Sequence, residues 1–220
     1  MFIQRYAETA EFSVIVQGYS LARLFQAVVV VAALAGCAAE PSREPEVREQ
    51  GSSQKARLEE ARKVDPAVRA DFEAALAMLK NEKYEQGIEM LTSVTKRAPN
   101  SSAPLINLAI AQQSIGKLDA AEESIKKALA INPSHPVANN EYGLLLRRTG
   151  RLAEARKVLE DTLKKHPNFA AARKNLAILC DLYLKDYECA IGNYQIYGAS
   201  TPDDKKVEIW IADLNKRTGR

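Results

Sequence analysis

The sequence predicts an all-α fold, an α-solenoid of about four helix hairpins followed by a C-terminal capping helix. Three prolines, Pro99, Pro133 and Pro167, recur at an even spacing of about 34 residues, and each follows a helical pattern of apolar residues. A fixed period of this size is typical of stacked helical repeats. One hairpin cannot bury its apolar face alone, so each copy needs neighbours on which to stack. The predicted architecture suits a scaffold better than an enzyme.

An apolar run from Leu24 to Ala35 follows Arg23 near the start of the chain. The run is too short to span a bilayer as a helix, but it suits the apolar core of a secretory signal. It ends in Leu34-Ala35-Gly36-Cys37, which closely resembles the lipobox of bacterial lipoproteins. The resemblance implies cleavage after Gly36 and acylation of Cys37. Residues 1–36 are therefore predicted to be a lipoprotein signal peptide.

The alternative interpretation of this segment is a buried cysteine at the end of an ordinary core helix, although no helix cap or polar face accompanies the run. Ala38 follows the cysteine. By resemblance to Gram-negative sorting, a residue other than aspartate at this position favours the outer membrane. Two or three acyl chains on Cys37 would anchor the chain firmly, since one chain alone binds marginally. We therefore expect an outer-membrane lipoprotein that faces the periplasm.

Residues 37–63 are predicted to form a tether between the lipid and the repeats. The segment from Ala38 to Gln54 combines prolines, charges and a Gly-Ser pair, and it contains no aromatic residue. Such a composition cannot bury enough apolar surface to order itself. Residues 55–63 either extend the first helix or remain frayed.

The repeats are clearest in two copies, Ser102–Pro133 and Pro136–Pro167. Each copy contains an apolar-periodic helix, a glycine at the turn, and a second helix that ends before proline, because the residue before proline avoids the α region. Small residues recur at matching positions, which allows two antiparallel helices to approach closely: Ala109 with Gly143, and Ala121 with Ala155.

These copies resemble tetratricopeptide repeats, whose period is about 34 residues. The matching residues are Leu108-Ala109, Gly116, Ala121, Ala128 and Pro133 in one copy, and Tyr142-Gly143, Gly150, Ala155 and Pro167 in the next. A degenerate copy precedes them from about Val68 to Pro99, and another follows from Ala170 to about Pro202. We assign residues 64–201 to the repeats. The motifs are specific for the fold and nearly silent on function.

The cysteines predict a second covalent feature. Three cysteines in an exported protein leave one over, and the lipidated Cys37 is that one. Cys180 lies near the end of the first helix of the last repeat, and Cys189 lies near the start of the second. A hairpin folded around residues 184–186 makes them face each other, and the periplasm is oxidising. A disulfide would contribute about 2–3 kcal/mol to this hairpin, which has one extra residue in its turn and no turn glycine. Two separate buried thiols are the alternative.

Residues 202–220 are predicted to be a capping helix over the open end of the stack. Thr201 and Pro202, followed by two aspartates, suit a helix start with a capping hydroxyl, a proline in the first turn and early acids. Four apolar residues then recur at helical spacing: Val207, Trp210, Ile211 and Leu214.

Neither the charge nor the motifs predict chemistry. Basic and acidic residues are interspersed, with a net charge of +3, and no basic stripe with interleaved aromatics suggests nucleic acid. The sequence contains no phosphate-binding glycine loop, nucleophile elbow or metal-binding helix pair. His135 and His166 lie in turns beside proline without partner ligands. We therefore expect no catalytic residue, no cofactor and no metal, and we predict that the protein is not an enzyme.

In tetratricopeptide proteins the first helix of each repeat lines a concave groove, so the resemblance implies a set of partner-binding residues. Carried over by position, these are Arg69, Phe72, Leu76, Leu79, Ile106, Ile110, Gln113, Asn140, Leu144, Arg147, Lys174, Ile178 and Asp181. This apolar floor with a few cations suits an extended or helical peptide. Lys174 and Asn140 weakly resemble a clamp for a terminal carboxylate, whereas Asn107 and Asn175 are assigned a structural role. Alternatively, some of these residues pack against neighbouring repeats.

The expected function is a scaffold that holds a protein or peptide of an envelope machine, such as pilus secretin assembly or a TonB-type system. The alternative is an accessory subunit or binding module for peptidoglycan enzymes. That alternative predicts sugar-stacking aromatics in the groove, where Phe72 is the only one expected.

Overall fold

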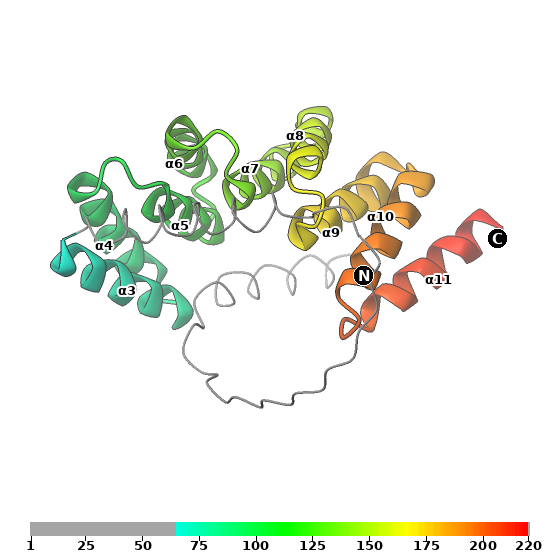
Figure 1. Ribbon diagram of the computed structural model, residues 1–220, viewed down its shortest axis with the longest axis horizontal. Helices are drawn as coiled ribbons and strands as arrows, with labels where there is room; N and C mark the ends of the chain where they lie inside the picture. The colour runs from blue at the N-terminus through cyan, green and yellow to red at the C-terminus, as the bar shows by residue number, and fades with distance from the viewer. Residues whose placement is uncertain (1–64, 220) are drawn as a thin grey trace, which may run out of the picture. The chain divides into compact units, whose positions relative to one another are not determined.

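A computed structural model describes residues 65–219 of the chain, and every regular element in that range is a helix. Four successive hairpins are followed by one more helix, α11 (Lys206–Thr218), as Figure 1 shows. The hairpins are α3 (Pro66–Lys80) with α4 (Tyr84–Arg97), α5 (Ser102–Ser114) with α6 (Leu118–Ile131), α7 (Pro136–Arg148) with α8 (Leu152–Lys165), and α9 (Ala170–Ile178), continued by the π-helix η2 (Leu179–Leu184), with α10 (Tyr187–Ser200). The predicted all-α solenoid is confirmed. The predicted signal peptide 1–36, Cys37 and the tether 37–63 lie outside the described residues.

The helices of the described part form two rows. The first helices α3, α5, α7 and α9 contact one another in sequence, whereas the second helices α4, α6, α8 and α10 make no comparable contacts with each other. Figure 1 shows α4, α6 and α8 on the outer side of the first helices. We call the first helices, with η2, the inner row and the second helices the outer row. None of the described helices combines the length and apolar character needed to cross a membrane.

The two helices of a hairpin meet at small buried residues, as the sequence predicts. Ala109 and Ala177 are fully buried at this position. Gly143 takes the same position in α7, where an added Cβ would lie 2.9 Å from Cδ2 of Leu159 in α8. The helices α7 and α8 therefore approach too closely for a side chain at residue 143 without movement of Leu159.

Each turn between paired helices contains one residue with left-handed backbone. In the second and third hairpins this residue is Gly116 (φ 77°) or Gly150 (φ 78°). Glu82 (φ 60°) and Lys185 (φ 58°) take its place in the first and last hairpins. The last hairpin therefore keeps the turn conformation of the others without a glycine.

The extra residue of the last repeat lies before the turn, within η2, whereas the sequence predicted it in the turn itself. In the third hairpin the N–H of Arg151, just after the left-handed residue, donates to the carbonyl oxygen of Leu146, five residues earlier. In the last hairpin the N–H of Asp186 donates over 2.9 Å to the carbonyl oxygen of Cys180, six residues earlier. The inserted residue thus widens the end of the first helix.

The capping helix begins later than predicted, at Lys206 instead of near residue 202. The Thr201 hydroxyl donates over 2.7 Å to the carbonyl oxygen of Tyr197, so it satisfies the end of α10 instead of starting α11. Residues 201–205 form a turn between the two helices. Val207 and Leu214 are buried, as are Ala172 and Leu179, their counterparts one repeat earlier in the inner row. Helix α11 therefore takes the place that the first helix of a further repeat would occupy.

Candidate partner-binding surface

The inner row presents one line of apolar side chains along the stack. Leu76, Ile110, Leu144 and Ile178 occupy equivalent positions, each one repeat period after the last, in α3, α5, α7 and α9. Leu144 is 9% exposed, and the other three are half-buried. We call these four residues the apolar line. Leu144 is buried, so the apolar line offers accessible surface at three of its four positions, in α3, α5 and α9.

Seven of the thirteen predicted binding residues keep solvent-accessible surface in the structure. They are Arg69, Phe72, Leu76, Ile110, Arg147, Lys174 and Ile178. Arg69 is exposed at the start of the inner row, whereas Phe72 is half-buried and packs against the core of the first hairpin.

The other six predicted residues are buried, which contradicts their assignment to an open groove. They are Leu79, Ile106, Gln113, Asn140, Leu144 and Asp181. Several of them contact the next helix of the inner row. The side-chain amide oxygen of Asn140 accepts a 2.9 Å hydrogen bond from Asn175. The backbone carbonyl oxygen of Gln113 accepts a hydrogen bond from Arg148. These positions hold neighbouring repeats together, and Asn175 has the structural role expected for it.

Lys174 does not act as a carboxylate clamp in this structure. Its ammonium lies 3.1 Å from the carboxylate of Asp204, which the turn before α11 supplies. The rings of Tyr197 and Trp210 lie 5.1 Å from the same ammonium. Burial alone would raise the pKa of Asp204, but hydrogen bonds from Lys174 and Tyr197 hold that pKa below its usual range. The charge of Lys174 is therefore neutralised within the chain.

Two features of the inner row were missed by sequence reasoning. Tyr183 in η2 is 45% exposed, and the guanidinium of Arg147 lies 5.5 Å over its ring. The inserted residue shifts the register there, so the repeat period could not place this side chain. Glu141 is half-buried and lies one repeat period after Asn107 and one before Asn175. That recurrence is visible in the sequence and could have identified Glu141 as a further residue of the inner row.

The outer row is linked by charge pairs. The guanidinium of Arg151, before α8, donates two hydrogen bonds to the carboxylate of Glu122 in α6, at 3.0 and 2.5 Å. These bonds, helped by Lys126, lower the pKa of Glu122 to about 2. One repeat farther on, Arg156 of α8 donates over 2.9 Å to Asp186, the residue that precedes α10.

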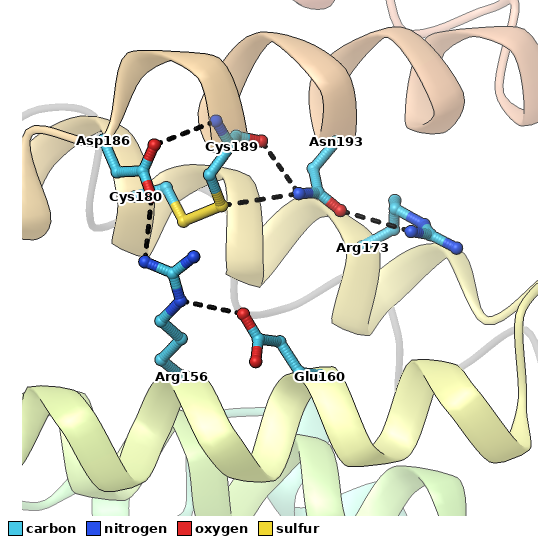
Figure 2. The surroundings of a disulfide bond; sticks show 7 residues. All are labelled: Arg156, Glu160, Arg173, Cys180, Asp186, Cys189 and Asn193. Atoms are coloured by element: carbon cyan, nitrogen blue, oxygen red, sulfur yellow. Dashed lines mark hydrogen bonds and ion pairs between the residues drawn. A yellow bond between two sulfur atoms is a disulfide. The ribbon is translucent and has the colours of Figure 1, made fainter.

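The structure joins Cys180 and Cys189 by a disulfide, with the two Cα atoms 5.9 Å apart (Figure 2). The carboxylate of Asp186 accepts a 3.1 Å hydrogen bond from the N–H of Cys189. That bond and the one from Arg156 lower the pKa of Asp186. The Asn193 amide donates to the carbonyl oxygen of Cys189. The pair thus connects the end of the inner-row helix to the start of α10, as the sequence predicts.

One cluster in the described range has the composition of a metal site, namely Cys180, Asp186 and Cys189. Both sulfurs are already bonded to each other, and the Asp186 carboxylate is engaged by Arg156 and by the N–H of Cys189. The atoms of this cluster that could bind a metal are therefore already engaged in bonds within the chain.

Comparison with curated proteins finds partial relatives. The tomato (Solanum lycopersicum) protein SPINDLY, a probable UDP-N-acetylglucosamine–peptide N-acetylglucosaminyltransferase, is 32% identical over 99 residues, which are 44% of this chain and 10% of that protein. The photosystem I assembly protein Ycf3 of Synechococcus sp. (strain CC9605) is 36% identical over 73 residues, which are 33% of this chain and 40% of that protein. The chain therefore spans less than half the length of each of these relatives.

Comparison with solved structures supports the fold. The structure of Pseudomonas aeruginosa PilF matches with a TM-score of 0.65 at 24% identity, covering 70% of this chain and 70% of that chain. A sequence model of the tetratricopeptide repeat matches residues 70–140 and 116–179, which together span half of the 220 residues. With its stacked hairpins and its row of contacting first helices, the chain belongs to the tetratricopeptide repeat family.

Proposed function

We propose that this chain is a membrane-anchored scaffold lipoprotein that holds a partner protein or peptide in the bacterial envelope. The partner would lie along the inner row of the repeats, and the lipid on Cys37 would fix the scaffold to the outer membrane. Residues 37–63 would form the tether between the two. Pilus secretin assembly and a TonB-type system are the machines in which we expect such a scaffold to work.

The observation that carries this proposal is the apolar line. Leu76, Ile110 and Ile178 stay partly exposed, and Ile110 and Ile178 also pack in part against the cores of their repeats. Partly exposed apolar side chains aligned on one face are typical of surfaces that bind other proteins, and the buried Leu144 is the one interruption of this alignment. The partial likeness to the photosystem I assembly protein Ycf3 supports an assembly role. The lipobox-like Leu34-Ala35-Gly36-Cys37 supports the envelope location.

The partner-binding surface is tested by crosslinking from intact envelopes with a matched pair of variants. Leu76→Arg introduces a charge into the apolar line, and Ile131→Arg introduces the same charge at a residue of outer-row helix α6 that is 39% exposed. We expect Leu76→Arg to lose the crosslinked partner and Ile131→Arg to keep it, with both variants as helical as the parent. Equal recovery of the partner by both variants would contradict binding along the apolar line.

The anchor is tested by fractionating cells that produce single-residue variants of the lipobox region. We expect Cys37→Ala to leave the membrane pellet, because no sulfur is left to carry the lipid. Ala38→Asp keeps the cysteine and should move the protein from the outer to the inner membrane fraction. If Cys37→Ala still sediments with membranes, the lipid anchor is wrong, whatever the repeats bind.

The peptidoglycan alternative receives less support from the inner row. Sugar binding by stacking needs aromatic faces that are open to the ligand. Phe72 packs against the first core, and one face of the Tyr183 ring is covered by Arg147. A sedimentation assay with purified peptidoglycan separates the two functions, since only the alternative predicts that the chain pellets with the polymer.

A further inference from the structure

Helix α11 is fastened to the last repeat by a charge pair near each of its ends. Before its start, the carboxylate of Asp204 pairs with Lys174. Near its end, Arg217 donates over 2.7 Å to the carboxylate of Asp181, and its guanidinium lies 5.3 Å over the ring of Tyr187. The two fastenings use separate parts of the last repeat, so each can be weakened on its own.

The contacts of Arg217 near the end of α11 are made to residues within the loop that the disulfide closes. The Cys180–Cys189 disulfide closes a loop with a sequence separation of 9, and Asp181 and Tyr187 both belong to that loop. The other ion partner of Arg217, Asp213, lies on α11 itself. In contrast, Lys174, Tyr197 and Asp204 all lie outside the loop. Only the end of α11 therefore depends on a surface whose shape the disulfide constrains.

The two residues of the disulfide loop that Arg217 contacts come from different helices. Asp181 comes from the widened π-helix η2, and its side chain is only 8% exposed. Tyr187 is the first residue of α10. Because the disulfide joins η2 directly to α10, it limits the distance between the Asp181 carboxylate and the Tyr187 ring. Without that bond the inserted residue in η2 leaves this end of the hairpin with more conformational freedom.

We propose that the Cys180–Cys189 pair is a redox switch that controls whether the C-terminal end of α11 stays bound to the last hairpin. In the disulfide form, η2 and the start of α10 hold Asp181 and Tyr187 where Arg217 can engage both. Reduction loosens the positions of Asp181 and Tyr187 relative to each other, so that Arg217 loses both contacts and the C-terminal end of α11 is released. Release uncovers the side of the last hairpin that Leu214 now covers, so a dithiol reductant would control access to this end of the stack.

The chemistry is thiol–disulfide exchange with a dithiol of the thioredoxin class. Cys180 is fully buried and Cys189 is half-buried, so the attacking thiolate reaches the sulfur of Cys189. A mixed disulfide forms, and the Cys180 sulfur leaves as a thiolate and takes up a proton. The second thiol of the reductant then displaces Cys189 and becomes part of the reductant's own disulfide. The protein gains two electrons and two protons in total, and the dithiol loses them.

Hydrogen exchange of the full chain in mild detergent, read by mass spectrometry, tests the redox switch. The oxidised protein is compared with protein reduced by dithiothreitol, with free thiols at Cys180 and Cys189 verified in each sample. We expect amides of residues 211–218 to exchange about ten-fold faster or more after reduction, as for locally released helices. Amides of α5 and α6 should exchange at unchanged rates.

Two variants show whether Arg217 carries the coupling. Oxidised Arg217→Gln should already exchange fast at residues 211–218, and reduction should add little. Lys174→Gln removes the fastening outside the loop, so its α11 should still respond to reduction. Equal α11 protection in both redox states overturns the proposal. A loss of protection that extends through α5 and α6 also overturns it, because the disulfide would then stabilise the whole stack.

Discussion

At the residue scale, Glu122 shows how one carboxylate ties two repeats together. Arg151 and then Lys126 lower its pKa to about 2, whereas a glutamate in an unfolded chain titrates at about 4.3. As the pH falls, the unfolded chain therefore binds the proton first. The stabilisation is fully present above about pH 4.3 and is lost as the pH falls towards the folded pKa.

This titration predicts a pH-dependent difference between the parent protein and Glu122→Gln. At pH 7 we expect the variant to lose about 1 kcal/mol of unfolding free energy, a value reduced for solvent because Arg151 remains 32% exposed. The loss should shrink towards zero near pH 2. Urea unfolding of both proteins across this range measures it, and the comparison cancels the titration of other carboxylates. A difference independent of pH would show that the ion pair is not its cause.

At the scale of elements, small residues allow the close approach of paired helices: Gly143 on the first helix of the third hairpin, and Gly87 on the second helix of the first hairpin. Alanine at Gly143 would bring its Cβ to 2.9 Å from Leu159, whereas alanine at Gly192 in α10 would meet nothing within 4 Å. Both substitutions gain helix propensity of about 0.5–1 kcal/mol. Only the first must also push α7 and α8 apart or move Leu159.

Alanine substitutions at Gly143 and Gly192 are therefore expected to change the unfolding free energy in opposite directions. Gly192→Ala should raise the unfolding free energy by about 0.5–1 kcal/mol. Gly143→Ala should lower it, because overpacking typically costs about 1–3 kcal/mol and exceeds the gain in propensity. Thermal unfolding by circular dichroism measures both. Stabilisation by Gly143→Ala would mean that Leu159 moves aside at little cost.

The same scale explains which elements the sequence could predict. Prolines, turn glycines and small residues act within one hairpin, so their spacing located the helices and the Cys180–Cys189 pair. The start of α11 depended instead on contacts between elements. One carboxylate oxygen of Asp204 accepts from Lys174 and Tyr197, and the other accepts from the N–H of Lys206, the first residue of α11. The acidic stretch thus lies in the turn before the helix and not in its first turn, where the sequence predicted it.

At the scale of the whole molecule, residues 65–219 form a stack of tetratricopeptide repeats in which each hairpin contacts only its neighbours. The repeat period identified the helices of the inner row but not the direction of each side chain. Positions such as Asn140 and Glu141 are adjacent in sequence, yet the first is buried against the next repeat and the second is half-buried. Adjacent helical residues point about 100° apart, so the direction of each side chain and the neighbour that it meets decide which predicted residues lie inside.

The different bonding of the two rows also gives the stack a mechanical character. The inner row is joined by direct helix contacts, whereas α6, α8 and α10 are linked by Arg151–Glu122 and Arg156–Asp186. Packed apolar surfaces resist stretching at any salt concentration, but partly exposed ion pairs weaken as counterions screen them. Each outer-row helix also packs on the first helix of the next repeat, and apolar residues of α6 and α8 share a core with α7 and α9. Salt therefore acts on the ion pairs between outer-row helices and leaves the apolar packing between repeats in place.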